Sequence, residues 1–159
     1  MATLTTTITE ALTLNGKDRG STNTLTVTGI NDVYHRIITC PDDVPVTVAT
    51  FHANVGTSDA SLDIELVKYI RITNLDGANP VIIDLQIDPA ENDSAASDNA
   101  ALLLEAGKSF IMGTPSDGIV VNSQGAAPIT ATSSLVNLES IIIDPLSEAV
   151  KVEVFIASA

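Results

Sequence analysis

The sequence is poor in cysteine and in aromatic residues. Cys40 is the only cysteine among 159 residues, so no disulfide can form within the chain. A small secreted module held together by disulfides is therefore excluded. Aromatic residues make up 3% of the chain and tryptophan is absent. We expect a core of valine, isoleucine, leucine and alanine, because branched aliphatic side chains have well-defined rotamers and pack densely.

Positive charge is also scarce. Seven lysines and arginines stand against twenty aspartates and glutamates, which gives a formal charge of −13. This balance argues against a nucleic-acid partner, since such binding requires cations that neutralise phosphates. It argues equally against an anionic membrane surface. The acidity favours solubility and repulsion between copies.

Long hydrophobic runs are missing as well. The longest, SIIIDPL (140–146) and GIVVN (118–122), have the length of strands, whereas a membrane-spanning helix needs about 20 apolar residues. The opening MATLTTTITEAL has neither the basic nor the apolar segment of a signal peptide. We therefore expect no membrane partner, and synthesis and assembly in a cytoplasm.

What the sequence does have is alternation of apolar and polar residues. In SLDIELVKYIRITNLDG (61–77), apolar residues occupy even positions from Leu62 to Ile72, and Tyr69 and Arg71 fall on the opposite side. This period of two is typical of a half-buried strand. Lys68 alone interrupts the apolar side, and twelve residues would extend for about 40 Å. We therefore expect a bulge or bend near Lys68.

The same alternation recurs along the chain, separated by turn sequences rich in Gly, Asn, Asp and Pro. Further predicted strands lie in TLTTTITEALTL (3–14), TLTVTGI (24–30), VTVATF (46–51), PVIIDLQI (80–87) and AVKVEVFI (149–156). The first of these places Leu4, Ile8, Leu12 and Leu14 on one face and threonines on the other. The spacing predicts one domain over 1–159, all-β, an antiparallel sandwich or jelly roll of nine or ten strands. Residues 1–10 are a candidate extended N-terminal arm.

One segment departs from this pattern. Residues 88–107 are rich in alanine and acidic residues, and 98–107 could form a short helix capped by Ser97 or Asp98 and ended by Gly107. The alternative is a polar loop over 88–99 followed by a hairpin that turns at Ala106-Gly107. We favour the hairpin, because Gly107 lies midway between two apolar runs.

Residues that carry chemistry are sparse. His35 and His52 stand alone without a second ligand at zinc spacing, and Cys40 has no basic neighbour that would stabilise a thiolate. The acidic loop 88–99 carries carboxylates suited to calcium, but its spacing does not match a known calcium loop. We expect no enzyme, no cofactor and no metal site, with Cys40 as a small buried residue.

Five phrases follow one another along the chain: EALTLNG (10–16), VTGINDVYHRIITCP (27–41), KYIRITNLDGANPVIIDLQI (68–87), LLLEAGKSFIM (102–112) and VKVEVFIASA (150–159). In this order and spacing they resemble small virion structural proteins of tailed bacteriophages, notably those of marine cyanobacteria. The resemblance implies a β-sandwich that decorates or joins the phage particle, and it transfers no active site. It does not distinguish a head protein from a tail protein.

These observations lead to three functional expectations. The first is a capsid decoration, or cement, protein that clamps the major capsid protein as a small homo-oligomer, with a trimer favoured, at the virion surface. The second is a neck, tail or fibre-associated virion component. The third, from another class, is a carbohydrate-binding or calcium-dependent adhesin module. Tyr34, Arg36, Tyr69 and Arg71 are the predicted interface residues, because Tyr and Arg are enriched at binding hot spots.

Overall fold

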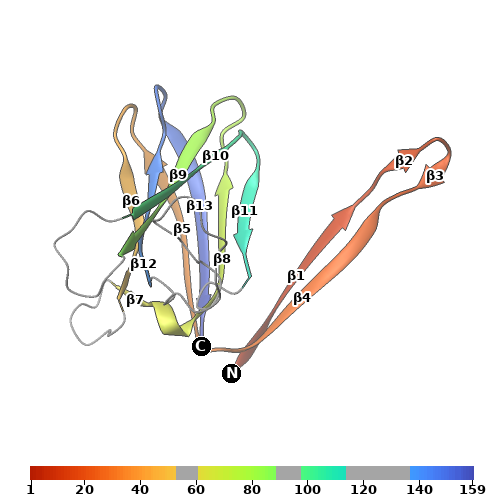
Figure 1. Cartoon of the computed structure of the whole chain (residues 1–159), viewed down its shortest axis with the longest axis horizontal. Helices are drawn as coiled ribbons and strands as arrows, with labels where there is room; N and C mark the ends of the chain where they lie inside the picture. The colour runs from red at the N-terminus through yellow and green to blue at the C-terminus, as the bar shows by residue number, and fades with distance from the viewer. Residues whose placement is uncertain (53–60, 89–97, 114–136) are drawn as a thin grey trace, which may run out of the picture.

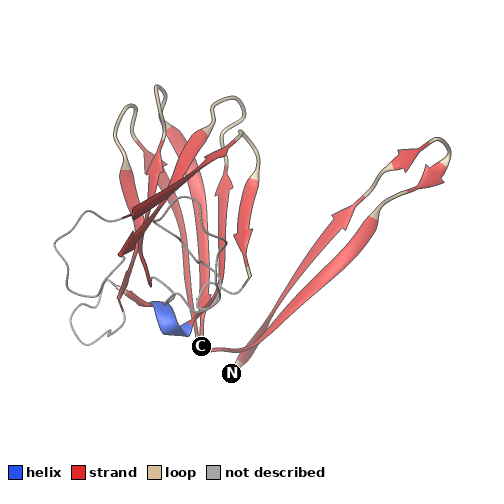
Figure 2. Ribbon diagram, viewed as in Figure 1, coloured by secondary structure: helices blue, strands red, loops and turns tan. Residues whose placement is uncertain are grey.

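A computed structural model describes residues 1–52, 61–88, 98–113 and 137–159. Within these ranges the chain forms thirteen strands and one 3₁₀ turn, so the predicted all-β class is confirmed (Figure 2). Nine of the strands build two facing sheets, which form the predicted sandwich. The other four form a long hairpin that projects from one end of the sandwich (Figure 1).

The first sheet of the sandwich has five strands in the order β10-β9-β12-β6-β7. Their bounds are β6 Val46–His52, β7 Leu62–Asp63, β9 Val81–Asp88, β10 Asp98–Leu104 and β12 Asn137–Asp144. All neighbours are antiparallel except β6 and β7, which pair in parallel. The sheet therefore joins segments from three separate parts of the chain.

The second sheet has four antiparallel strands in the order β11-β8-β13-β5. Their bounds are β5 Asp32–Cys40, β8 Val67–Asn74, β11 Ser109–Met112 and β13 Val150–Ser158. β13 lies inside the sheet, between β8 and β5. Because β5 pairs with β13, the sheet depends on contacts between residues more than a hundred positions apart.

The core fills the space between the two sheets with aliphatic side chains, as the composition predicted. Alternate residues of β13, namely Val150, Val152, Val154 and Ile156, are fully buried, and Cys40 is buried beside them. Residues of β6, β8, β9 and β12 complete the interior: Val48, Phe51, Ile70, Ile72, Val81, Ile83, Leu138, Ile141 and Ile143. Branched residues on alternate positions thus produce both the strands and the dense interior.

The long strand predicted over 61–73 is interrupted where the sequence indicated. β7 ends at Asp63, whose carboxylate accepts a hydrogen bond from the Glu65 N–H and caps the 3₁₀ turn η2 (Ile64–Leu66). In β8 the pairing with β13 skips Lys68, since Ala157 faces Tyr69 and Ser158 faces Val67. The predicted bulge near Lys68 is confirmed.

The prediction for 98–112 is half right. Both apolar runs are strands and no helix forms there, but they do not pair with each other as a hairpin. β10 pairs with β9 in the five-stranded sheet, and β11 pairs with β8 in the opposite sheet. The turn at Glu105–Lys108 therefore crosses from one layer to the other, and this crossing lets Leu104, Phe110 and Met112 contact the same core.

The turn between β8 and β9 is organised by two side chains. Asn74 is fully buried and donates from Nδ2 to the carbonyls of Asn79 and Leu104, at 2.9 and 3.3 Å. The Asp76 carboxylate accepts hydrogen bonds from the backbone N–H groups of Ala78 and Asn79. These bonds to the charged form lower the pKa of Asp76.

Candidate interaction surface

The projecting hairpin, called the arm here, comprises residues 2–30. β1 (Ala2–Glu10) pairs with β4 (Ser21–Ile30), and β2 (Thr13–Leu14) pairs with β3 (Lys17–Asp18) near the tip. Asn15 and Gly16 form the connecting turn with φ of 53° and 73°. Two successive positive φ values are what a type I′ hairpin turn requires, which explains the Asn-Gly sequence.

Gly20 keeps the arm continuous between its two pairs of strands. A Cβ atom at this position would collide with the backbone carbonyl of Glu10 on the opposite strand. The two strands of the arm keep one pairing register from the Thr3–Thr28 pair to the Leu14–Lys17 pair. Ser21 Oγ donates to a Glu10 carboxylate oxygen at 2.5 Å and joins the two strands beside Gly20.

This register gives the arm two different faces. One is a ladder of four directly opposed threonine pairs: Thr3–Thr28, Thr5–Thr26, Thr7–Thr24 and Thr9–Thr22. The other carries Leu4, Ile8, Leu12 and Leu14 from the first half of the hairpin and Leu25 and Val27 from the second, together with Thr6, Glu10 and, opposite Leu14, Lys17. The leucines and the isoleucine are separated from Thr3, Thr5, Thr7 and Thr9 as predicted, whereas Thr6 lies beside them. We call this second side, which is mainly apolar, the apolar face.

The base of the arm packs on its own sandwich. Ile30, Tyr69 and Ala157 are buried together, and Leu4, Val27, Ile111 and Phe155 pack against them. The sandwich residues of this contact lie on the outer side of β8, β13 and β11, away from the core: Tyr69, Ala157, Phe155 and Ile111. Leu25 Cδ2 lies 3.1 Å from the position of a Cβ atom on Gly113, so the absence of a side chain there makes room for Leu25.

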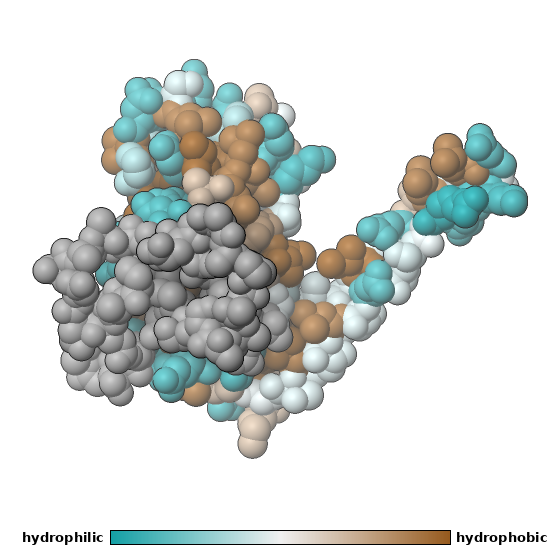
Figure 3. Space-filling view, in the orientation of Figure 1, coloured by the Kyte–Doolittle hydropathy of each residue, from teal (hydrophilic) through white to brown (hydrophobic). Residues whose placement is uncertain are grey.

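Beyond the base, the arm leaves the sandwich and its apolar face becomes exposed. Leu25 is 37% exposed, Ile8 47%, and Leu12 and Leu14 each 55%. Figure 3 shows hydrophobic residues both where the arm leaves the sandwich and at its tip. The apolar face therefore extends well past the part that its own domain covers.

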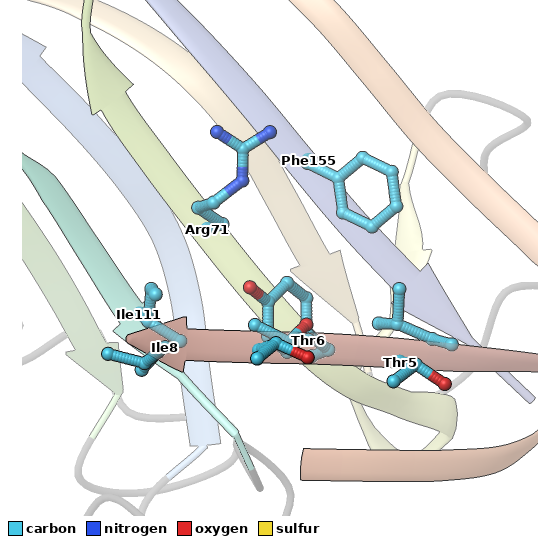
Figure 4. A pocket seen from close by; sticks show the side chains of 9 residues that line it. Thr5, Thr6, Ile8, Arg71, Ile111 and Phe155 are labelled. Carbon is cyan, nitrogen blue, oxygen red and sulfur yellow. The ribbon is translucent and has the colours of Figure 1, made fainter. Parts of the chain in front are cut away.

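The divergence of arm and sandwich opens a groove of about 370 Å³. One wall is formed by β1 from Leu4 to Ile8, and the floor by Tyr69, Arg71, Ile111 and Phe155. In Figure 4, β1 crosses the sheet with Thr5, Thr6 and Ile8 along it, while Arg71 and Phe155 come from strands of the sheet. The groove is thus mainly apolar and carries one cationic side chain.

A charged network lies on the same sheet face as the groove. The Glu153 carboxylate is 2.7 Å from Arg71 Nη1 and 2.7 Å from His35 Nε2. Arg71 also donates to Thr73 Oγ1 at 2.6 Å and lies 5.8 Å from the Phe155 ring centre. The hydrogen bond from Arg71, and then that from His35, lower the pKa of Glu153.

Phe155 connects this network to the groove. Its ring makes edge contacts with His35 and Tyr69, at centroid distances of 5.6 and 6.0 Å. Arg71 is thereby held by Glu153 on one side and by an aromatic ring on the other. The face presents a fixed cation rather than a mobile one, a property useful for recognition.

The four predicted interface residues separate into two pairs. Tyr69 and Arg71 lie on the outer face beside the arm, where Tyr69 is buried under the arm base and Arg71 lines the groove. Tyr34 and Arg36 lie on the inner side of β5. Tyr34 donates its hydroxyl to the Val48 carbonyl at 3.0 Å and so bridges the two sheets, with the Arg36 guanidinium 5.7 Å from its ring centre.

Reasoning from single strands missed several residues of this surface. Glu153, Phe155 and Ile111 acquire their importance only through pairing across the sheet. For the hairpin arm, in contrast, the sequence carries a signal. The threonine alternation at 22–28 mirrors that at 3–9 across the Asn-Gly turn. Two matching alternations around such a turn indicate a hairpin.

Of the residues considered for catalysis or metal binding, His35 lies in the charged network of this surface, where it bonds to Glu153. Cys40 is fully buried in the core, and burial raises the pKa of its thiol, so the prediction of a small buried residue is confirmed. Within the described ranges no three His, Cys, Asp or Glu side chains come together as metal ligands. Residues 89–97 of the acidic loop lie outside the described residues.

No helix among the described residues is both long and apolar enough to cross a bilayer. Comparisons with family models, with curated proteins and with solved structures found no match to this chain. The features that bear on function are therefore the arm, the groove and the charged network.

Proposed function

We propose that this protein is a structural component of a tailed-phage particle, and specifically a decoration protein that binds the major capsid protein as a homo-oligomer, with a trimer expected. Its task is to hold neighbouring shell subunits together. It acts by binding and not by catalysis. Many copies on one shell would combine weak contacts into strong attachment, because repeated sites act together.

The observation that carries this proposal is the arm. A β-hairpin that leaves its domain with an exposed apolar face on one side serves contact with another molecule, since it adds little to its own core. Exposed strands also provide unpaired backbone groups for adding a further strand. The sequence resemblance to virion structural proteins supports the same role.

The side chains on the outer face also favour binding over turnover. Arg71 forms an ion pair with Glu153, and His35 hydrogen-bonds to the same carboxylate. The hydroxyls of Thr73 and Ser109 bond to each other, and Thr73 also accepts a hydrogen bond from Arg71. Such a network fixes charges in place but leaves no base aligned on a nucleophile. The described part of the chain thus favours recognition.

A carbohydrate-binding module is not favoured by the aromatic residues. Sugar sites stack rings of ligand on exposed aromatic side chains, but Phe51 and Tyr69 are buried and Phe110 packs against the core. Tyr34 is engaged in bridging the sheets, which leaves Phe155 on the groove floor as a single ring.

The test is the copy number of this protein in purified phage particles, measured by quantitative mass spectrometry against the major capsid protein. A copy number that scales with the shell subunits, together with shells that become less heat-stable without the protein, is the expected result. A few copies per particle would instead assign it to the neck, tail or a fibre. Absence from particles would overturn the proposal.

A further inference from the structure

The apolar face of the arm is incomplete as a folded surface. An isolated two-stranded ribbon is marginally stable in water and needs packing against another surface. The arm has such packing at Leu4 and Val27, but Ile8, Leu12 and Leu14 are about half exposed. The distal half therefore requires a cover that its own chain does not supply within the described residues.

The same chain offers a matching surface elsewhere. The groove floor, with Ile111 and Phe155, lies on the sheet face that already receives the arm base. On the adjacent strand β5, Val33 and Ile37 of this outer face are 45% and 64% exposed. The contact of Leu4 and Val27 with this face shows that the arm and the sheet are complementary.

An arm cannot place its tip on its own sheet in this arrangement. Figure 1 shows the hairpin running away from the sandwich, with β2 and β3 at the far end. The tip of one copy can thus reach only a neighbouring molecule. Within its described residues, each copy thus has a projecting ribbon with an apolar face and an apolar groove.

The distribution of charge favours another copy as that neighbour. Residues 1–30 contain two acidic and two basic side chains, which cancel, so the whole formal charge of −13 belongs to residues 31–159. Two sandwiches repel each other, whereas a neutral arm approaches an acidic sandwich without this cost. The arm is the part of the chain best suited to cross the gap between copies.

We propose that the distal apolar face of the arm, centred on Leu12 and Leu14, docks into the groove of a second copy against Ile111 and Phe155. This contact joins two different surfaces, so it closes into a ring when the rotation between copies permits. The inference deepens the proposed function, on which it rests for the homo-oligomer. It names the surfaces that hold the oligomer together.

The first experiment compares two double variants of the full chain by light scattering and sedimentation. Leu12→Asp with Leu14→Asp places charges in the contact and is expected to weaken self-association by roughly a hundredfold, since two buried leucines are lost. Thr24→Asp with Thr26→Asp adds the same charge to the opposite face of the same arm. This control is expected to associate like the wild type.

The second experiment locates the contact by disulfide cross-linking. Cys40 is fully buried, so it does not compete with engineered cysteines. A Leu14→Cys chain mixed with an Ile111→Cys chain is expected to form a linked heterodimer under mild oxidation. A Thr24→Cys chain mixed with the same Ile111→Cys chain is expected to form none.

Three results would overturn the inference: a wild-type monomer at every soluble concentration, unchanged association of the leucine double variant, or no link between positions 14 and 111. Circular dichroism and thermal unfolding confirm that each variant is folded before its association is measured. Because these measurements use the protein alone, their failure is distinct from failure to find the protein on particles.

Discussion

Glu153 shows how one residue can organise a protein surface. Its carboxylate accepts from Arg71 and from His35, which come from the two strands on either side of β13. It therefore ties three strands together across the outer face. The side chain is partly exposed, so solvent screens the ion pairs and each contributes modestly.

The lowered pKa of Glu153 gives stability a definite dependence on pH. Its folded pKa lies below its unfolded value, so its contribution is complete above the unfolded pKa and is lost as pH falls through the folded pKa. Asp76 acts in the same direction. We expect Glu153→Gln to reduce the free energy of unfolding by about 1 kcal/mol at pH 7. We also expect the free energy of unfolding of this variant to fall less than that of the wild type as the pH is lowered.

The measurement for Glu153 is urea unfolding at a series of pH values between about 7 and 3. Glu148→Gln is the matched control, because it removes the same charge from an exposed turn position outside the network. Equal pH dependence in the Glu153→Gln variant and the wild type would show that the network contributes nothing.

At the scale of elements, the arm and the sandwich are separable structures joined at a small packed base. Deleting residues 1–10 would not separate them cleanly, because it would leave β4 without its partner and expose Tyr69 and Ile30. A clean separation has to shorten both strands together. The constant register of the hairpin makes this possible.

We therefore predict the behaviour of a shortened arm in which residues 7–24 are replaced by Asn-Gly. Thr6 and Leu25, a hydrogen-bonded pair like Leu14 and Lys17 at the native turn, then flank the new type I′ turn, and Leu4 and Val27 keep their contacts with the sandwich. The thermal midpoint is expected to change by less than about 5 °C, while self-association is lost. Calorimetry and light scattering measure the two properties on one sample. A large fall in the midpoint together with retained association would contradict the prediction.

Alternation of residue types predicted the faces of the strands but not their partners. β9 and β13 were recognised because their apolar residues recur at every second position in a sheet buried on one side. The same signal left β10 and β11 ambiguous, since a period of two says nothing about which sheet a strand joins. For a related reason the sequence did not separate Tyr34 and Arg36, on the inner side of the sheet, from Tyr69 and Arg71 on the outer side: edge strand β5 exposes residues on both sides.

On the scale of the whole molecule, charge is divided unevenly. Residues 31–159 carry all of the formal charge of −13 and the arm carries none. Association of copies therefore depends on two opposing terms. Burial of apolar surface at the arm favours it, and charge repulsion between the sandwiches opposes it. The balance between these two terms responds to salt.

Raising the salt concentration from about 0.1 M to about 1 M shortens the Debye length from about 10 Å to about 3 Å. We expect self-association to become stronger, because repulsion between sandwiches is screened while the apolar contact of the arm is not weakened. Sedimentation at the two salt concentrations measures the change, and the Leu12→Asp, Leu14→Asp variant should stay monomeric at both. A weaker association in high salt would indicate a contact dominated by opposite charges.

The pairing of β5 with β13 also fixes an order of events during translation. His35 and Glu153 are 118 residues apart, which a ribosome takes roughly 6 to 24 s to synthesise. A hairpin such as the arm closes within about 10 μs of its emergence. The arm consequently has time to close before the sheet that contains β13 exists, and a neighbouring nascent chain presents no finished groove until its own β13 has been made.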